Sequence, residues 1–203
     1  MHHTTLRRLA SATGAITLAL SLAACGSGDT EDKTAGSTQT ARNGDVFNAA
    51  DVDFATAMIP HHAQALQMAL LAQDRPLPPD VRALVDQIQE AQAPEVETMT
   101  TWLTDWGKEI PPTAMDHANA GHDGGSMPGM MGSEQMAELE KSSDAEFPRR
   151  WMEMMIEHHQ GAIDMAKTEQ RSGSFAAAVA LAETIVDGQT AEIATMRDLI
   201  AQQ

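Results

Sequence analysis

One stretch of this sequence occurs twice. Residues 58–69 return 97 positions later as residues 155–166, and each copy contains an adjacent histidine pair. A second block recurs at the same offset without a gap, matching Ile88, Gln92, Glu95, Thr98 and Met99 to Ile185, Gln189, Glu192, Thr195 and Met196. The chain therefore contains two copies of one unit. Both copies keep residue types that bind metals as well as build helices.

The apolar residues predict helices. They recur at steps of three and four residues, the spacing of amphipathic helices, in four segments: 48–73, 80–106, 144–171 and 175–201. Short breaks at 75–80 and 171–174 make each repeat an antiparallel helical hairpin. Neither hairpin can bury its apolar stripe alone. The sequence therefore predicts one all-α domain, residues 47–203, in which two repeated hairpins pack as a four-helix bundle about an approximate twofold axis.

Local signals refine this expectation. Pro60 lies inside the first helix and should kink it there. Residues 143–146 fit a capping box that starts the third long helix, and residues 133–141 suggest a short additional helix. If both short turns lie at one end of an up-down-up-down bundle, the two histidine layers share one height toward the other end. The linker joining the hairpins could then fold back over them.

The N-terminal residues predict export. Arg7 and Arg8 precede an apolar run up to Ala24, too short to span a membrane comfortably, so residues 1–24 are interpreted as a signal peptide. Small residues before Cys25 resemble a lipobox, which would make this sole cysteine the site of lipidation and anchor the protein to a membrane. Residues 25–46 are small and polar, so we expect a flexible tether.

The charge is strongly acidic. Removing Arg7 and Arg8 with the signal peptide leaves 11 basic residues against 29 acidic ones. Nucleic acids and anionic lipid surfaces demand a positively charged face, so neither is expected as a partner. An acidic exterior attracts cations, although simple solubility would explain it equally well.

Helical geometry brings the repeated polar residues together. Antiparallel packing within the first hairpin places the donors Met58, His61 and His62 opposite Gln92 and Glu95. The second copy repeats this arrangement with Met155, His158, His159, Gln189 and Glu192. Adjacent histidines point about 100° apart around a helix, so both cannot face the core squarely, and the sequence leaves open which one does. The glutamates would be costly to bury unless paired, and a histidine NH across the hairpin is their natural partner, which makes them direct ligands or supports of the ligands.

This donor set favours copper. Thioether sulfur selects Cu(I), and imidazole suits copper in either oxidation state. Zinc would gain little from methionine, and the Glu-x-x-His pairs of di-iron bundles are missing because Met58 and Met155 precede the histidine pairs. Met68, Met99, Met165 and Met196 are expected mainly to fill the core.

The linker at about 107–143 is rich in methionine, histidine and glycine. Exposed methionine has no packing role, so this segment predicts a low-specificity trap for Cu(I) or Ag(I), with a simple spacer as the alternative. Its candidate donors are Met115, His117, His122, Met127, Met130 and Met131.

The repeated pattern Met-Ile-x-His-His-x-x-Ala-Ile-x-Met-Ala, followed by Gln-x-x-Glu-Ile-x-x-Met, resembles the family called domain of unknown function 305. Residues 155–166 with 189–196 match it best, and the first copy departs at Leu66 and Val96. The resemblance, over residues 47–201, implies a ferritin-like four-helix fold in an exported protein. It also implies copper binding, since some relatives are exported copper-binding proteins that contribute to copper tolerance.

We therefore expect an extracytoplasmic copper-binding protein that sequesters or transfers Cu(I) without turnover. Two alternatives remain open at this point, a metal oxidase acting on Cu(I) or Fe(II) and a metal-free helical interaction module. No hydrolase or kinase motif occurs in the sequence.

Overall fold

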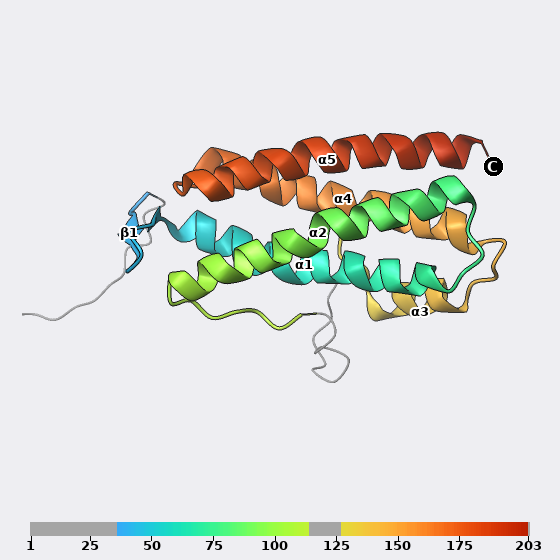
Figure 1. Cartoon of the computed structure of the whole chain (residues 1–203), viewed down its shortest axis with the longest axis horizontal. Helices are drawn as coiled ribbons and strands as arrows, with labels where there is room; N and C mark the ends of the chain where they lie inside the picture. Colours follow the sequence, from blue (N-terminus) through green and yellow to red (C-terminus); the bar gives the residue numbers. More distant parts are fainter. Residues whose placement is uncertain (1–35, 114–126, 203) are drawn as a thin grey trace, which may run out of the picture. The chain divides into compact units, whose positions relative to one another are not determined.

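The long helices form a four-helix bundle. The computed structural model describes residues 36–113 and 127–202, which belong to one compact unit, Thr34–Gln203. The elements of this part of the chain are β1 (Gln39–Thr40), β2 (Val46–Phe47), α1 (Ala49–Gln73), α2 (Pro79–Asp105), α3 (Ser133–Lys141), α4 (Phe147–Ser172) and α5 (Ala176–Ala201) (Figure 1). The predicted all-α class, the four long helices and the short helix at 133–141 are confirmed. None of the described helices is long and apolar enough to cross a membrane.

The two hairpins run in opposite directions, so the arrangement in which both short turns lie at one end does not occur. Asn48, at the start of α1, donates through Nδ2 to the Ser172 carbonyl oxygen at the end of α4, at 2.7 Å. At the other end, Arg75 after α1 binds Asp144 before α4, with Nη1 2.9 Å from Oδ1. α1 and α4 are therefore antiparallel neighbours, and the end of α2 and the start of α4 lie at opposite ends of the bundle (Figure 1). Joining these two ends takes a long crossover, as in ferritin-like folds.

Local chemistry sets the helix starts. Asn48 caps α1, because its Oδ1 accepts from the N–H groups of Ala50 and Asp51 while Asp51 Oδ2 accepts from the Asn48 N–H. Such a reciprocal cap contributes about 1 kcal/mol. α4 begins at Phe147, three residues later than the capping-box signal predicts. Pro148 has no N–H to donate to the carbonyl four residues before it, so a helix starting at 144 would lose that bond.

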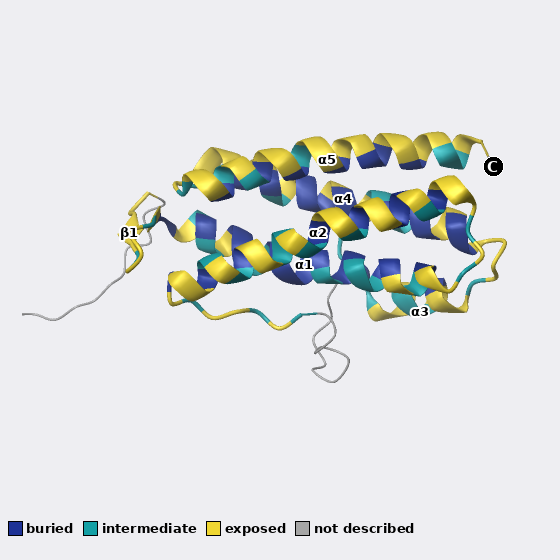
Figure 2. Cartoon of the chain, in the orientation of Figure 1, coloured by how far each residue is buried: buried dark blue, intermediate teal, exposed yellow. Residues whose placement is uncertain are grey.

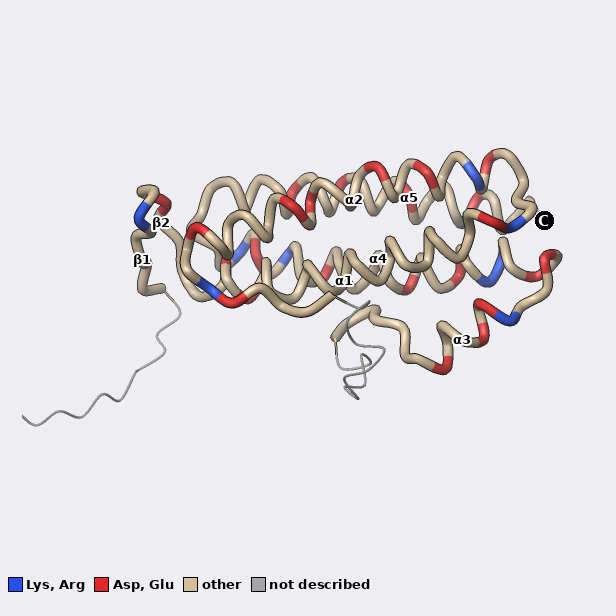
Figure 3. Tube along the Cα trace, turned by 60° about the horizontal axis from the view of Figure 1, so that its bottom comes forward, with Lys and Arg blue, Asp and Glu red and all other residues tan. Residues whose placement is uncertain are grey.

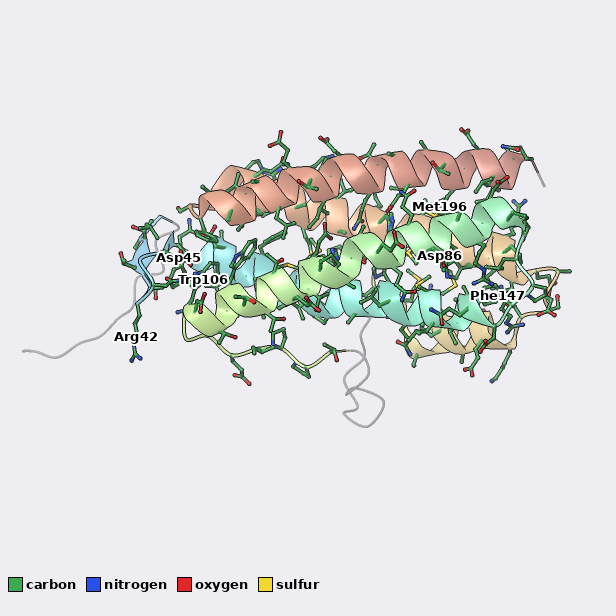
Figure 4. The ribbon with its side chains drawn as sticks, in the orientation of Figure 1. Arg42, Asp45, Asp86, Trp106, Phe147 and Met196 are labelled. Carbon is green, nitrogen blue, oxygen red and sulfur yellow. The ribbon has the colours of Figure 1, made fainter. Side chains whose placement is uncertain are left out.

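Part of the expected tether is ordered. β1 and β2 pair antiparallel, and Phe47 stacks on Trp106 with ring centroids 4.5 Å apart. Trp106 Nε1 donates to Asp45 Oδ2 at 3.2 Å, and both residues lie at the end of the bundle beside the strands (Figure 4). Lys108 places its ammonium over the Phe47 ring. Trp106, which directly follows α2, thus holds the residues just before α1 through both its ring and its indole N–H.

The core consists of two apolar clusters with a polar layer between them. One cluster surrounds Trp151 and Met68, and the other surrounds Phe54 and Met58. Along α1 and α4 the histidine pairs separate the two clusters. Buried residues follow the inward sides of the long helices, and exposed residues follow the outward sides (Figure 2).

Candidate metal centre

The four histidines of the repeats form a row across the middle of the bundle. The rings of His61 and His158 lie 3.8 Å apart between centroids, and His62 and His159 extend the row at 6.4 Å from their neighbours on each side. All four side chains are fully buried. Because both pairs lie near the midpoints of their helices, they share one height although α1 and α4 run in opposite directions. The sequence predicts a common height from turns at one end; the layer instead arises from the midpoints of antiparallel helices, and it lies at the centre of the bundle and not toward one end.

The two histidines of each pair have different directions. His61 and His158 face each other across the contact between α1 and α4. His62 and His159 turn toward the second helix of their own hairpins, and none of the four reaches solvent. Adjacent residues point about 100° apart around a helix, so the two histidines of each pair pack against different neighbouring helices and both are buried.

His62 and His159, the outer histidines of the row, each bind a glutamate. His62 Nε2 lies 2.7 Å from Glu95 Oε2, and His159 Nε2 lies 2.7 Å from Glu192 Oε2. The predicted pairing across each hairpin is confirmed. A carboxylate only accepts, so Nε2 carries the proton in both histidines. Gln87 adds a contact from α2, donating through Nε2 to Glu192 Oε1 at 3.2 Å.

The linker supplies the acceptor for His61. Its Nε2 lies 3.2 Å from the carbonyl oxygen of Pro128, so this nitrogen too carries the proton. The opposite nitrogen, Nδ1, has no hydrogen-bond partner among the described residues in any of the four histidines, and in His158 Nε2 also has none. Leaving a buried polar atom unpaired costs about 1–3 kcal/mol. Three imidazoles therefore have one nitrogen held by an oxygen acceptor and the other nitrogen bare, which is the arrangement of histidines that bind metals.

Burial keeps His61 and His158, the inner histidines of the row, neutral. It lowers the pKa of His61 to about 3, with the nearby His62 acting in the same direction, and it lowers the pKa of His158 well below its ordinary value. Burial also lowers the pKa of His159, although the bond to Glu192 opposes that shift. A neutral imidazole keeps a lone pair on its unprotonated nitrogen, so these residues need not lose a proton before they bind a cation.

The predicted methionine donors of the helices lie beside the row. Met58 and Met155 are fully buried and precede His61 and His158 by three residues, so each lies on the same side of its helix one turn away. Met68, Met99 and Met196 are also fully buried, as expected of residues that fill the core, whereas Met165 is partly exposed.

The predicted linker donors divide into three groups. Met131 is buried and packs in the cluster around Trp151, so the expectation that the linker methionines lack a packing role is wrong for this residue. Met127 and Met130 are half-buried. Met115, His117 and His122 lie outside the described residues, as does Cys25. Of the linker residues that the structure describes, those from 127 to 131 lie beside the histidine row.

The two glutamines of the repeat are buried near the row. Gln92 is 2% exposed and Gln189 is 5% exposed. Within the described part of the chain, neither side-chain polar atom of Gln92 makes a hydrogen bond, and Gln189 Oε1 makes none. They remain candidates for ligands or supports of ligands.

Sequence reasoning missed three residues at this centre, namely Gln64, Pro128 and Gly161. Gln64 binds the backbone of Met131, and Gly161 lies against Pro128. A signal was present, because positions 64 and 161 are equivalent in the repeat and differ completely in size. Pro128 carried no signal, since only the folded linker brings its carbonyl to His61.

No three His, Cys, Asp or Glu side chains of residues 36–113 and 127–202 are grouped so that they could hold a metal ion. The donors instead form a row of imidazoles with methionines on adjacent turns. Exposed Asp and Glu residues follow α2 and α5 and also occur on α3 and α4 (Figure 3). The histidine row thus offers neutral nitrogen donors with methionine sulfur nearby, inside a bundle whose exterior is acidic.

These features define a helical bundle with an acidic surface and a buried row of histidines. The chain belongs to the DUF305 family, a domain of unknown function, whose model matches residues 51–200. No curated protein matches it.

Solved structures of the family have the same fold. A DUF305 protein from Streptomyces coelicolor, described as secreted, is 31% identical with a TM-score of 0.67, covering 75% of this chain and 93% of its own. A DUF305 fragment from Deinococcus radiodurans is 29% identical with a TM-score of 0.67, covering 81% of this chain and 100% of its own. CopM in its Cu(I)-bound form is 26% identical with a TM-score of 0.61, covering 75% of this chain and 96% of its own. CopM has also been solved in Cu(II)-bound and Ag-bound forms, so copper and silver binding occurs among the structural relatives.

Proposed function

We propose that this protein is an extracytoplasmic, lipid-anchored copper-binding protein that sequesters or transfers Cu(I) and contributes to metal homeostasis or tolerance. The observation that carries the binding step is the row of buried histidines. Three of them have Nε2 held by Glu95, Glu192 or Pro128, and all four have a bare Nδ1. A bound cation would satisfy buried nitrogens that are otherwise unpaired.

The chemistry of the donors favours copper over harder or more demanding ions. Neutral imidazole and thioether suit Cu(I), whereas Mg²⁺ and Ca²⁺ require oxygen ligands. Met58 and Met155 lie on the turns next to the inner histidines and would supply sulfur to an ion bound there. The copper-bound forms of CopM support this choice of metal. The acidic outer sides of α2 and α5 would raise the local concentration of cations.

The proposed location rests on the N-terminal sequence. Residues 1–24 have the pattern of a signal peptide, and Cys25 follows small residues as in a lipobox. The relative from Streptomyces coelicolor, described as secreted, supports a site outside the cytoplasm.

Copper is cargo in this proposal, and the protein performs no turnover. An oxidase of Cu(I) or Fe(II) would need a redox-cycling metal with an open coordination position. Adding either ion to the protein in air should therefore give no sustained oxygen uptake above that of a variant with all four row histidines replaced by Ala. Sustained uptake that disappears in this variant would establish an enzyme instead.

A competitive titration tests the binding step. The protein carrying Cys25→Ser, which removes its only thiol, is titrated with Cu(I) under anaerobic conditions against a chromophoric chelator. We expect it to withdraw at least one equivalent of Cu(I) from the chelator. If the protein takes no Cu(I) from the chelator, the histidines have only a structural role, and a metal-free interaction module is favoured.

A further inference from the structure

Residues 127–131, here called the strap, lie against α1 and α4 beside the inner histidines. Gln64 of α1 holds the strap by two hydrogen bonds. Its Nε2 donates to the Met131 carbonyl oxygen at 2.8 Å, and its Oε1 accepts from the Met131 N–H at 2.7 Å. Gln64 is 5% exposed, so water scarcely competes for either bond. One side chain thus satisfies both backbone groups of Met131.

On its other side, the strap packs directly on the backbone of α4 at Gly161. A Cβ at Gly161 of α4 would overlap the carbonyl group of Pro128 and lie 2.7 Å from the Gly129 nitrogen. Gly129 has φ +75°, and a Cβ there would lie 2.7 Å from the Glu157 carbonyl oxygen and 2.8 Å from that of His158. The contact between Gly129 and Gly161 is therefore possible only because neither residue has a side chain.

Positions 64 and 161 are equivalent in the internal repeat, which makes their difference informative. One copy has a long amide that binds the strap, and the other has no side chain and so admits it. The surrounding histidine pairs are retained in both copies. The two repeats thus differ at the position where each contacts the strap.

The strap covers the inner histidines. Its Pro128 carbonyl oxygen occupies Nε2 of His61 at 3.2 Å, and Gly129 packs on the backbone of His158. Both rings are fully buried with the strap in place. An ion bound between α1 and α4 would therefore lie beneath this segment.

We infer that Gln64 and Gly161 are positioning residues that hold the strap closed over His61 and His158, so that bound Cu(I) leaves the pair only when the strap opens. This inference rests on the proposed function. It adds a specific step, in which the rate of metal release is set by the attachment of residues 127–131 and not by the histidines alone.

Two variants loosen the strap without touching a histidine. Gln64→Ala removes both bonds to Met131, and Gly161→Ala pushes Pro128 away. Gln67→Ala on the same helix is the control for the first, since Gln67 makes no hydrogen bond to the strap and is only half-buried. Gly188→Ala is the control for the second, because a Cβ at this helical glycine meets nothing within 4 Å. Gln64→Glu keeps the acceptor for the Met131 N–H but loses the donor.

The first measurement is amide hydrogen exchange at Met131 in the metal-free full-length protein. Loss of two buried hydrogen bonds should accelerate exchange about tenfold or more in Gln64→Ala, with a comparable acceleration in Gly161→Ala and a smaller one in Gln64→Glu. The two controls should exchange like the wild type. Unchanged exchange in both strap variants would overturn the inference regardless of any metal.

The second measurement is the rate at which Cu(I)-loaded protein, carrying Cys25→Ser throughout, transfers its metal to excess chelator. The strap variants should release Cu(I) about tenfold faster or more, in the same order as their exchange rates, while the controls match the wild type. If exchange accelerates and release does not, the strap is structural only and the inference fails while the proposed function stands. If the wild type takes up no Cu(I), the proposed function itself fails, and the release step falls with it.

Discussion

The imidazole rings of His61 and His158 lie 3.8 Å apart between centroids, although 97 residues separate them in the chain. Each comes from a different repeat, so neither hairpin builds this contact alone. Because helices α1 and α4 meet at their midpoints, the repeat produces one shared centre and not two separate ones.

This relationship predicts that the inner histidines act together. His61→Ala and His158→Ala should each weaken the tightest Cu(I) binding by at least about tenfold, and the double variant should lose little more than either single variant, because residues of one site are not additive. The affinities are measured by competition with a chromophoric chelator, and circular dichroism checks that the bundle remains helical. Two independent, additive losses would contradict a shared centre.

Glu95 and Glu192, which bind the outer histidines, should affect Cu(I) affinity without contacting the metal. Glu95→Gln and Glu192→Gln replace a carboxylate that only accepts with an amide that also donates, so the proton on Nε2 of His62 or His159 is no longer enforced. We expect Cu(I) affinity to fall about 10–100-fold in each variant.

Glu97→Gln, on the exposed side of α2, is the matched control and should leave the affinity unchanged. Equal affinity in all three variants would show that the glutamates only satisfy the buried N–H groups of His62 and His159.

A buried acid pair at the end of the bundle predicts a pH dependence of stability. Glu169 is 1% exposed, and burial, reinforced by the neighbouring Asp51, raises the pKa of its carboxyl group to about 8. A pKa raised above the unfolded value of 4.5 means that the stability it contributes is full below 4.5 and is lost as pH rises toward 8. Glu169→Gln should therefore melt higher than the wild type at pH 8, by about 2 °C or more, and the difference should shrink toward pH 5.

The histidines have the opposite dependence. The pKa of His61 lies below its ordinary value of 6.5, so the stability this residue contributes is full above 6.5 and is lost as pH falls toward about 3. Melting curves between pH 6.5 and 8.5 thus isolate the effect of Glu169. The exposed Glu183→Gln serves as control, and a parallel pH response in both variants would exclude the acid pair as its source.

The linker methionines should contribute to the number of Cu(I) ions bound and not to the tightest Cu(I) affinity. Met131 is part of the core, so replacing it would disturb packing, but Met127 and Met130 are half-buried and can be changed together with Met115. Replacing these three with Ser should lower the number of Cu(I) ions bound while the tightest affinity remains. Capacity is measured by metal analysis after gel filtration, and an unchanged number would make the linker a spacer.

Much of this centre follows from the sequence because periodicity and repetition are local signals. The spacing of apolar residues predicts the long helices, and the distances from the first turn place His62 level with Gln92. The cost of burying Glu95 unpaired then predicts its contact with a histidine across the hairpin. The direction of the second hairpin did not follow, since it depends on a long crossover whose packing involves α3 and the strap. For the same reason Pro128 could not be predicted as the acceptor for His61, because no periodic pattern places an irregular segment.

The most direct test of the histidine row is a long-range proton–nitrogen correlation spectrum of protein labelled with nitrogen-15 at histidine, recorded before and after one equivalent of Cu(I). Metal-free His61, His62 and His159 should carry their proton on Nε2, and Cu(I) should shift the bare Nδ1 resonances of the row. Proton positions on Nδ1, or Cu(I)-induced shifts confined to His117 and His122 of the linker, would contradict the proposed metal centre.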